Sequence, residues 1–460
     1  MSALRGWLAA HRVVAVLLVL LTIAGGVARG IVAAHPTKFQ AADENAYARI
    51  AHSLADRHSF TPHGMSDPMR WGPGAPIALA VSMRLDPGVS TNPHDVKSAY
   101  PWQAAFGTLL IPATFIIGLL LAGEIAGIVA AAAVAAYPPL IDASGDLLTE
   151  PLGALMLALA LIAMLLALRR PTWWRAVVTG VLFGLTVLVR VDLLAIPAIA
   201  AAMLAITVLI RSGLRGALLP TAAIVAGILI PLAPWSIFAS GVKGQFVPVT
   251  SGGYSNLFIG TYLPGGGRLY GVKKELAPKV FKLHPKLAGE PYASVPQTLI
   301  FQAIEHEHPG LSENDALKEA SKQNIRRYAI GQPLRFAGML AQKAWRLWGW
   351  PTRGSGRTRE GWMRLIHLPL VILATIGLAL ALILRRARDP GIWTLTLILL
   401  YVTATNAVLV AEPRHNLPVM PVLTVAGAVG YVLAYRRWGR RPPAEAHETV
   451  GGTRVETSTT

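Results

Sequence analysis

Carboxylates and guanidiniums stand beside several of the long apolar runs in this sequence. A carboxylate can act as a general base by accepting a proton from an attacking group. The planar fork of arginine donates paired, permanently charged hydrogen bonds that suit the oxygens of a phosphate group. Residues of these types could therefore activate a nucleophile and hold a departing phosphate. They are Asp43, Glu44, Glu150, Arg190, Asp192, Glu412 and Arg414.

These residues also have structural interpretations. The apolar residues between Tyr47 and Ala55 recur at helical spacing, which predicts a short helix lying on the membrane surface. Asp43 stands at the start of that helix and could cap it by accepting hydrogen bonds from free backbone N–H groups. Glu150 could equally form a structural ion pair, because buried acids near arginine often serve only each other. The sequence leaves both alternatives open.

The composition is that of an integral membrane protein. Of 460 residues, 53% are hydrophobic and 14% are charged, and the mean hydropathy is +0.48. The net charge is +18, but many of the lysines and arginines stand in short loops beside apolar runs, so membrane topology explains them better than nucleic-acid binding does. The sequence contains no cysteine, which excludes disulfides and thiolate metal sites.

Apolar runs near the spanning length predict about ten transmembrane helices. Basic residues cluster in the loops on one side of these helices, and the positive-inside rule places that side, with both termini, in the cytoplasm. The acids and arginines of the candidate site then lie at the extracytoplasmic ends. The predicted helices cover residues 13–32, 101–121, 124–141, 151–168, 176–190, 193–210, 217–239, 364–384, 391–410 and 417–435. The basic clusters contain Arg5, Arg12, Arg169, Arg170, Arg175, Arg211, Arg215, Arg385, Arg386, Arg388, Arg436, Arg437, Arg440 and Arg441.

The predicted fold class is an all-α polytopic membrane protein. Interfacial helices are expected in the first outer loop, and a small, mainly helical domain is expected outside the membrane. The predicted parts are a transmembrane module at 1–240 with its first outer loop at 33–100, an extracytoplasmic domain at 241–362, C-terminal transmembrane helices at 363–440 and a disordered cytoplasmic tail at 441–460.

The outer segments carry their own patterns. Residues 69–85 contain an apolar run too short to span a membrane, which is typical of an interfacial or re-entrant segment. The outer domain begins with a turn-rich stretch at Thr250. In EHEH at 305–308, neighbouring helical positions point apart, so we predict no metal site there. Helical patterns follow the turns at 296–307, 312–329 and 333–349.

The order of these elements resembles the multi-pass glycosyltransferases of the C superfold, in particular the group with the protein O-mannosyltransferases and the lipid A aminoarabinose transferases. The resemblance covers residues 10–240 and, more loosely, the C-terminal helices, but not the outer domain. This sequence departs from the pattern at Gly72-Pro73, where a proline pair is usual, and in its lower helix count. The matching motifs are Asp43-Glu44, GPGAP at 72–76, AAYPP at 135–139, Glu150, Arg190, and Arg414 with Pro418 and Pro421.

The resemblance implies sugar transfer from a polyprenyl-phosphate donor. Nucleotide sugars are cytoplasmic and the sequence has no Walker-type loop, so an enzyme acting outside needs a lipid-linked donor. Asp43 is the predicted general base, Glu44 supports it or orients the acceptor, and Arg190 and Arg414 bind the donor phosphate. A single displacement would invert the anomeric centre. No cofactor is required, although a divalent cation could join Asp43 to the phosphate.

The remaining donor-site residues are Glu150 and Asp192, predicted to contact the donor sugar or phosphate. The expected acceptor is a cell-envelope glycan, a lipid or a protein, and the expected location is a bacterial plasma membrane with the active site on its extracytoplasmic side. The sequence does not indicate which sugar is transferred. No nucleic-acid partner is expected.

Two other classes of function compete with this interpretation. A transporter or lipid flippase places charges near the bilayer midplane, often in repeated halves. Here the charges gather at one face and no internal repeat is evident. A non-catalytic receptor or assembly subunit could bind glycans or peptides through the outer domain, but it would not need acids and arginines from so many separate segments.

Overall fold

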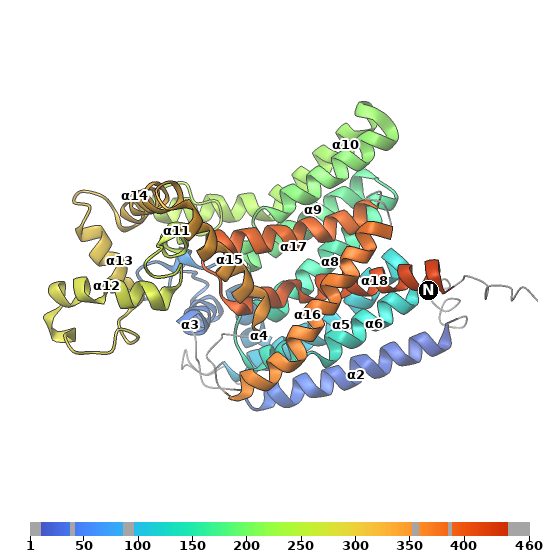
Figure 1. The fold of residues 1–460 in the computed structure, drawn as a ribbon, viewed down its shortest axis with the longest axis horizontal. Coiled ribbons are helices and arrows are strands. Elements are labelled where there is room, and N and C mark those ends of the chain that lie inside the picture. Colours follow the sequence, from blue (N-terminus) through green and yellow to red (C-terminus); the bar gives the residue numbers. More distant parts are fainter. Residues whose placement is uncertain (1–10, 37–41, 86–95, 352–357, 385–388, 440–460) are drawn as a thin grey trace, which may run out of the picture.

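The computed structural model describes residues 11–36, 42–85, 96–351, 358–384 and 389–439. Every regular element in those residues is helical, which confirms the predicted all-α fold class. Figure 1 shows long helices running side by side in a bundle, with the shorter helices α11 to α14 gathered at one end of it. The predicted tail at 441–460 and the basic residues Arg5, Arg385, Arg386, Arg388, Arg440 and Arg441 lie outside the described residues.

Seven of the described helices are long and apolar enough to cross a membrane, or eight if one bent pair counts as a single span. Large apolar side chains such as Val16, Ile23 and Leu218 are exposed on α2 and α10, as expected where a helix faces lipid tails. The chain is therefore a multi-pass membrane protein. The seven helices are α2 (Arg12–Ala34), α5 (Tyr100–Ala122), α8 (Glu150–Arg169), α10 (Ile196–Lys243), α16 (Thr358–Leu384), α17 (Pro390–Val408) and α18 (Met420–Trp438).

The predicted helix at 124–141 is broken. The structure has α6 (Glu124–Ala136) and α7 (Pro138–Asp142), with a bend of 57° between them. Proline lacks a backbone N–H and its ring displaces the residue before it from the helical region, so the pair Pro138 and Pro139 ends α6 and starts a new helix. The single straight helix predicted for this segment is therefore wrong.

The element α10 contains two predicted helices. It is assigned as 48 residues, but Gly213 inside it has φ 69, a left-handed conformation that interrupts the helical path. An unbroken helix of this length would extend about 70 Å. Leu194 and Thr250, at its two ends, nevertheless line the same cavity. The chain therefore turns back at Gly213, so 193–210 and 217–239 are separate helices, as the sequence predicted. The preceding helix, α9 (Trp173–Val189), packs against α10.

Short helices form the end of the molecule that carries the candidate site. The two segments predicted to lie at the membrane surface are α3 (Ala42–Arg57) and α4 (Gly74–Leu85). The turn-rich stretch after Thr250 also contains a helix, α11, that the sequence did not indicate, because its glycines favour turns. The outer helices are α11 (Gly253–Thr261), α12 (Leu269–Leu283), α13 (Gln297–His306), α14 (Glu313–Asn324), the π-helical turn Ile325–Ile330 and α15 (Pro333–Gly349).

The outer helices have their own apolar core, and the buried Lys343 attaches them to the bundle. Phe258, Val272 and Phe301 are fully buried together. Lys343 of α15 is 1% exposed, and its Nζ donates to the carbonyls of Gly260 at 3.0 Å, Val408 at 3.3 Å and Leu409. These carbonyls lie at the ends of α11 and α17, where carbonyl groups lack a partner within the helix. Lys343 therefore fastens the outer helices to the bundle.

Acidic and basic groups lie at opposite ends of the bundle. Helix α8 begins at Glu150 and ends at Arg169, so these residues are about 30 Å apart along its axis. Arg169 and Arg211 line a cavity at the far end. The structure therefore separates the basic residues predicted for the inner side from Glu150, which was predicted for the outer side. Which end faces the cytoplasm stays a prediction.

Candidate functional site

Most of the predicted site residues line one cavity of about 980 Å³ at the end of the bundle where α8 begins. They come from segments far apart in the sequence, namely α3, the start of α8, the end of α9, and the turns before α10 and α18. Packing of the helix ends therefore brings them together as expected. The residues of the prediction that line it are Asp43, Glu150, Arg190, Asp192 and Arg414.

Arg414 binds two carboxylates, and one of them is Asp43, the predicted base. It lies in the 3-10 segment Pro413–Val419, and its Nη2 donates to Asp43 Oδ2 at 2.8 Å while its Nε donates to Glu412 Oε2 at 2.7 Å. The indole Nε1 of Trp71 donates to the other oxygen, Asp43 Oδ1, at 3.1 Å. Both carboxylate oxygens of Asp43 are thus engaged by side chains from other segments.

The charges around Asp43 set its protonation state. Burial raises the pKa of Asp43, but the charge of Arg414 and the hydrogen bonds from Arg414 and Trp71 outweigh burial, so the pKa lies below its usual value. Asp43 is therefore a carboxylate at neutral pH. Its basicity is also held down as long as Arg414 remains its partner.

Arg190 forms the second charged group of the cavity. Its Nη2 and Nε donate to the two oxygens of Asp192 at 2.8 and 3.1 Å. Its Nη1 donates to Thr149 Oγ1 at 3.0 Å and lies 3.4 Å from Glu150 Oε1. Within the described residues, Glu150 Oε2 is buried and has no hydrogen-bond partner. Glu150 thus pairs with Arg190 through one oxygen and keeps the other as a vacant acceptor.

The GPGAP motif has a packing reason. A Cβ on Gly72 would lie 2.7 Å from the carbonyl oxygen of Leu188, and a Cβ on Gly74 would lie 2.8 Å from the Cα of Val189. Only glycine permits this approach of the loop to the end of α9. The contact places Trp71 beside the cavity and fixes the backbone that leads into Arg190. The motif therefore supports the site through backbone packing, and Gly72 also lines the cavity.

Glu44 is the predicted site residue that the structure does not bring into the cavity. It is 1% exposed, and the backbone N–H of Leu147 donates to its Oε1 at 3.3 Å. Successive side chains on a helix point about 100° apart, so Asp43 and Glu44 of α3 cannot face the same space. The predicted contact between Glu44 and the acceptor is therefore not supported by its position.

Several residues of the cavity were absent from the prediction. Tyr47 stands four residues after Asp43 on the same face of α3, a spacing that could have indicated it. Burial and the charges of Asp43 and Glu150 raise the pKa of Tyr47, so its hydroxyl stays protonated. Tyr401 of α17 donates to the carbonyl of Asp192 at 3.0 Å. No sequence pattern indicates that contact.

The charges of the cavity are unevenly distributed. At its inner part, four carboxylates surround the guanidiniums of Arg190 and Arg414. Arg49, Arg70 and Lys273 also line the cavity. Arg70 donates to Ser255 Oγ at 3.3 Å, and Lys273 donates to the carbonyl of Ala293 at 3.2 Å. The cavity therefore offers cations for an anionic group and acids for hydroxyls.

Metal ligands do not cluster in the part of the chain that the structure describes. No group of three or more histidine, aspartate or glutamate side chains there could hold a metal ion. The EHEH residues form no such cluster either: His308 Nδ1 lies 2.9 Å from the carbonyl oxygen of Ile304, and Glu307 pairs with Lys279 at 2.5 Å. The question of a divalent cation stays open to experiment.

No protein-family model and no curated protein matches the sequence. The structure is similar to the oligosaccharyltransferase AglB from Archaeoglobus fulgidus in complex with an inhibitory peptide and a dolichol-phosphate, with a TM-score of 0.55 and 13% identity over 94% of this chain and 51% of that chain. The apo form of the A. fulgidus enzyme gives a TM-score of 0.54 and 14% identity over 92% of this chain and 51% of that chain.

A third similar structure is ArnT from Cupriavidus metallidurans bound to undecaprenyl phosphate, with a TM-score of 0.42 and 15% identity over 92% of this chain and 78% of that chain. The predicted resemblance to the glycosyltransferases of the C superfold is confirmed at the level of the fold. The chain spans about half the length of the oligosaccharyltransferases that it matches.

Proposed function

We propose that this protein is an integral-membrane glycosyltransferase. It moves a sugar from a polyprenyl-phosphate donor to an acceptor hydroxyl at the extracytoplasmic face of a bacterial plasma membrane. The observation that carries this function is the pairing of Asp43 with Arg414, beside Arg190, in one cavity at the end of a membrane-spanning bundle. A base and two phosphate-binding cations are the groups that such a transfer needs.

The reaction is a single displacement. The acceptor oxygen attacks the anomeric carbon and forms the new glycosidic bond as its proton passes to the carboxylate of Asp43. The bond from that carbon to the phosphate oxygen breaks, and the polyprenyl phosphate leaves with the electron pair. A phosphate leaving group does not require a separate general acid, unlike the sugar leaving group of glycoside hydrolysis. The product therefore has the inverted anomeric configuration.

Arg414 links donor binding to the strength of the base. Its Nη2 donates to Asp43 Oδ2 at 2.8 Å. We assign the donor phosphate as a competing partner for this guanidinium, because phosphate oxygens accept charge-assisted hydrogen bonds well. When Arg414 turns to the phosphate, Asp43 loses the strongest influence that lowers its pKa, so burial raises that pKa against the weaker effect of the Trp71 hydrogen bond. The base therefore becomes stronger once the donor is in place.

The other residues hold the donor and its surroundings. Arg190 supports the phosphate, and Asp192 keeps its guanidinium in place through two hydrogen bonds. The vacant Oε2 of Glu150 is placed to accept a hydrogen bond from a hydroxyl of the donor sugar. Glu44 acts from behind the cavity, since its bond with Leu147 ties α3 to the segment before α8. This positioning role replaces the acceptor contact expected from the sequence.

The lipid-linked donor follows from the fold and the charges together. The structurally similar AglB was solved with a dolichol-phosphate. In this chain, the basic end of α8 lies about 30 Å from Glu150, and the positive-inside rule then places the cavity outside. Acceptors in this compartment are cell-envelope glycans, lipids or proteins. No cofactor is needed for the displacement, and activity with and without a chelator tests whether a divalent cation contributes.

Reconstitution tests the proposed function. The purified protein is placed in liposomes that contain polyprenyl phosphates carrying radiolabelled sugars, together with envelope acceptors. Transfer predicts that the label leaves the lipid and joins an acceptor. A transporter or flippase would move the labelled lipid across the bilayer without releasing its sugar, and a binding subunit would do neither. Either of those results would refute the transferase assignment.

A further inference from the structure

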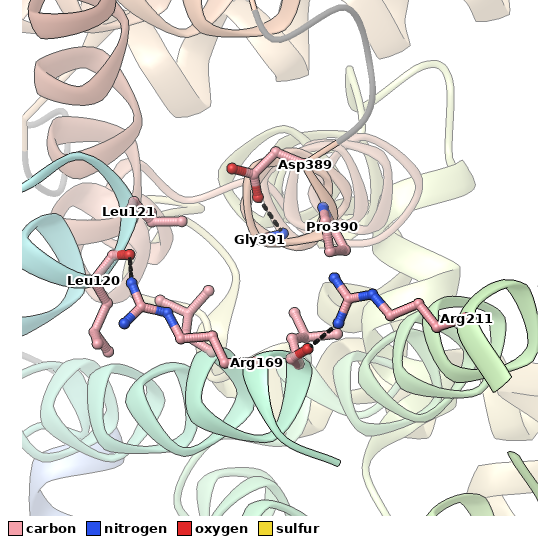
Figure 2. Close-up of a pocket in the computed structure, with 9 residues that line it drawn as sticks. Leu120, Leu121, Arg169, Arg211, Asp389, Pro390 and Gly391 are labelled. Atoms are coloured by element: carbon pink, nitrogen blue, oxygen red, sulfur yellow. Dashed lines mark hydrogen bonds between the residues drawn. The ribbon is translucent and has the colours of Figure 1, made fainter. Parts of the chain in front are cut away.

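A second cavity, of about 510 Å³, lies at the end of the bundle away from the candidate active site. Figure 2 shows Arg169 and Arg211 on opposite sides of it, below the start of α17. Arg169 is the last residue of α8, whose first residue, Glu150, lies in the other cavity. The two cavities are therefore at opposite ends of the same helix. The wall between the arginines is apolar and consists of Leu120, Leu121, Leu165 and Leu168.

The two arginines are held toward the cavity by backbone carbonyls. Arg169 Nη2 donates to the carbonyl of Leu120, and Arg211 Nη1 donates to the carbonyl of Leu168. Both carbonyls belong to the last turns of their helices, where carbonyl groups have no partner within the helix. In the described part of the chain, neither arginine forms an ion pair. Each guanidinium is thus oriented by one hydrogen bond and keeps its other N–H groups for a ligand.

Among the described residues that line the cavity, Asp389 is the one acid, and it has a structural task. Asp389 is the N-cap of α17, and its Oδ1 accepts hydrogen bonds from the backbone N–H groups of Gly391 at 2.9 Å and Ile392 at 3.4 Å. A carboxylate at this position stabilises the helix start. The described lining therefore contains two guanidiniums and one carboxylate, so its net charge is positive.

We propose that this cavity binds the phosphate headgroup of an anionic phospholipid from the leaflet opposite the candidate active site. Two arginine forks on either side of one space suit a phosphate. The four leucines suit the glycerol and the first carbons of the acyl chains. Both arginines are exposed at the end of membrane-spanning helices, the depth at which headgroups lie. Basic pockets between transmembrane helices at this level recognise anionic lipids. This site is independent of the proposed transferase function.

Lipid retention tests the assignment. The protein is purified with phosphatidylglycerol or phosphatidylcholine, and the lipids that stay bound are counted by native mass spectrometry. We expect selective retention of phosphatidylglycerol, weakened about fivefold for each arginine removed in Arg169→Gln and Arg211→Gln. Arg215→Gln is the matched control, because Arg215 is exposed four residues after Arg211, beyond the turn at Gly213, and does not line the cavity. It should bind as the wild type does.

Three results would overturn the assignment. Equal retention of the two lipids would show that the headgroup charge is not recognised. Unchanged retention of phosphatidylglycerol in the Arg169→Gln, Arg211→Gln double variant would place the lipid elsewhere. Displacement of the lipid by inorganic phosphate at equal concentration would make the site one for a soluble anion. Arg169→Lys and Arg211→Lys keep the charges without the planar forks, so they carry the test if the double variant does not fold.

Discussion

Replacing Arg414 by glutamine should change both the donor requirement and the pKa of Asp43. The proposed mechanism assigns both effects to this side chain. Arg414 donates to Asp43 at 2.8 Å and to Glu412 at 2.7 Å. In the proposed donor complex, it binds the phosphate. A hydrogen bond to a charged group contributes about 1.5–3 kcal/mol. At 1.36 kcal/mol for each factor of ten, its loss raises the donor concentration needed for half-maximal rate about 10- to 100-fold.

The same substitution should move the acid limb of the pH profile of kcat/KM, measured at donor concentrations well below half-saturation, where Asp43 of the wild type still has Arg414 as its partner. The charge of Arg414 outweighs burial and keeps the pKa of Asp43 low. Without that charge, burial raises the pKa. The base works only as a carboxylate, hence above its pKa, so the rate of Arg414→Gln should begin to fall at a higher pH than that of the wild type. Initial rates of sugar transfer across the acidic to mildly alkaline range measure this shift.

Two variants separate the effects. Arg414→Lys keeps the positive charge but loses the planar fork, so the donor requirement should rise while the acid limb stays close to that of the wild type. Arg335→Gln changes an exposed arginine of α15, so it should alter neither property. Arg414→Gln leaves two carboxylates without their partner, so thermal unfolding is measured in parallel. An acid limb and a donor requirement that both match those of the wild type would refute the assigned role of Arg414.

Three further predictions concern the base, the product and the contact made by Lys343. Asp43→Asn should lower the transfer rate by about 10²–10⁴-fold while expression and donor binding persist, and near wild-type turnover would remove Asp43 as the base. The product should carry the inverted anomeric configuration, measured by NMR, and retention would exclude a single displacement. Lys343→Met should leave the carbonyls of Gly260 and Val408 unpaired and lower the melting temperature through a loss of about 1–3 kcal/mol, whereas an unchanged temperature would contradict the attachment.

The sequence predicts the helices well, because length and apolarity determine them. Every predicted transmembrane segment contains a helix in the structure. The exceptions have local causes. Pro138 breaks one span, a break that proline chemistry could have predicted. Helix α11 begins at Gly253 in a glycine-rich stretch, where tertiary packing of Phe258 overrides the preference of the sequence for turns.

The sequence predicts at which end of the helices the site residues lie, but it does not predict which of these residues contact each other. Placing Asp43, Arg190 and Arg414 at one face required only helix boundaries and the distribution of basic loops. The contact between Asp43 and Arg414 joins residues 371 positions apart, and it depends on the rotation of each helix end, which no local pattern fixes. The different directions of Asp43 and Glu44, in contrast, follow from helical geometry alone.

A structure of the protein with bound polyprenyl phosphate tests the central claim most directly. The account predicts that the phosphate lies within hydrogen-bond distance of both Arg414 and Arg190, and that Asp43 Oδ2 no longer accepts a hydrogen bond from Arg414. A phosphate bound away from both arginines, with the Asp43–Arg414 pair intact, would contradict the account.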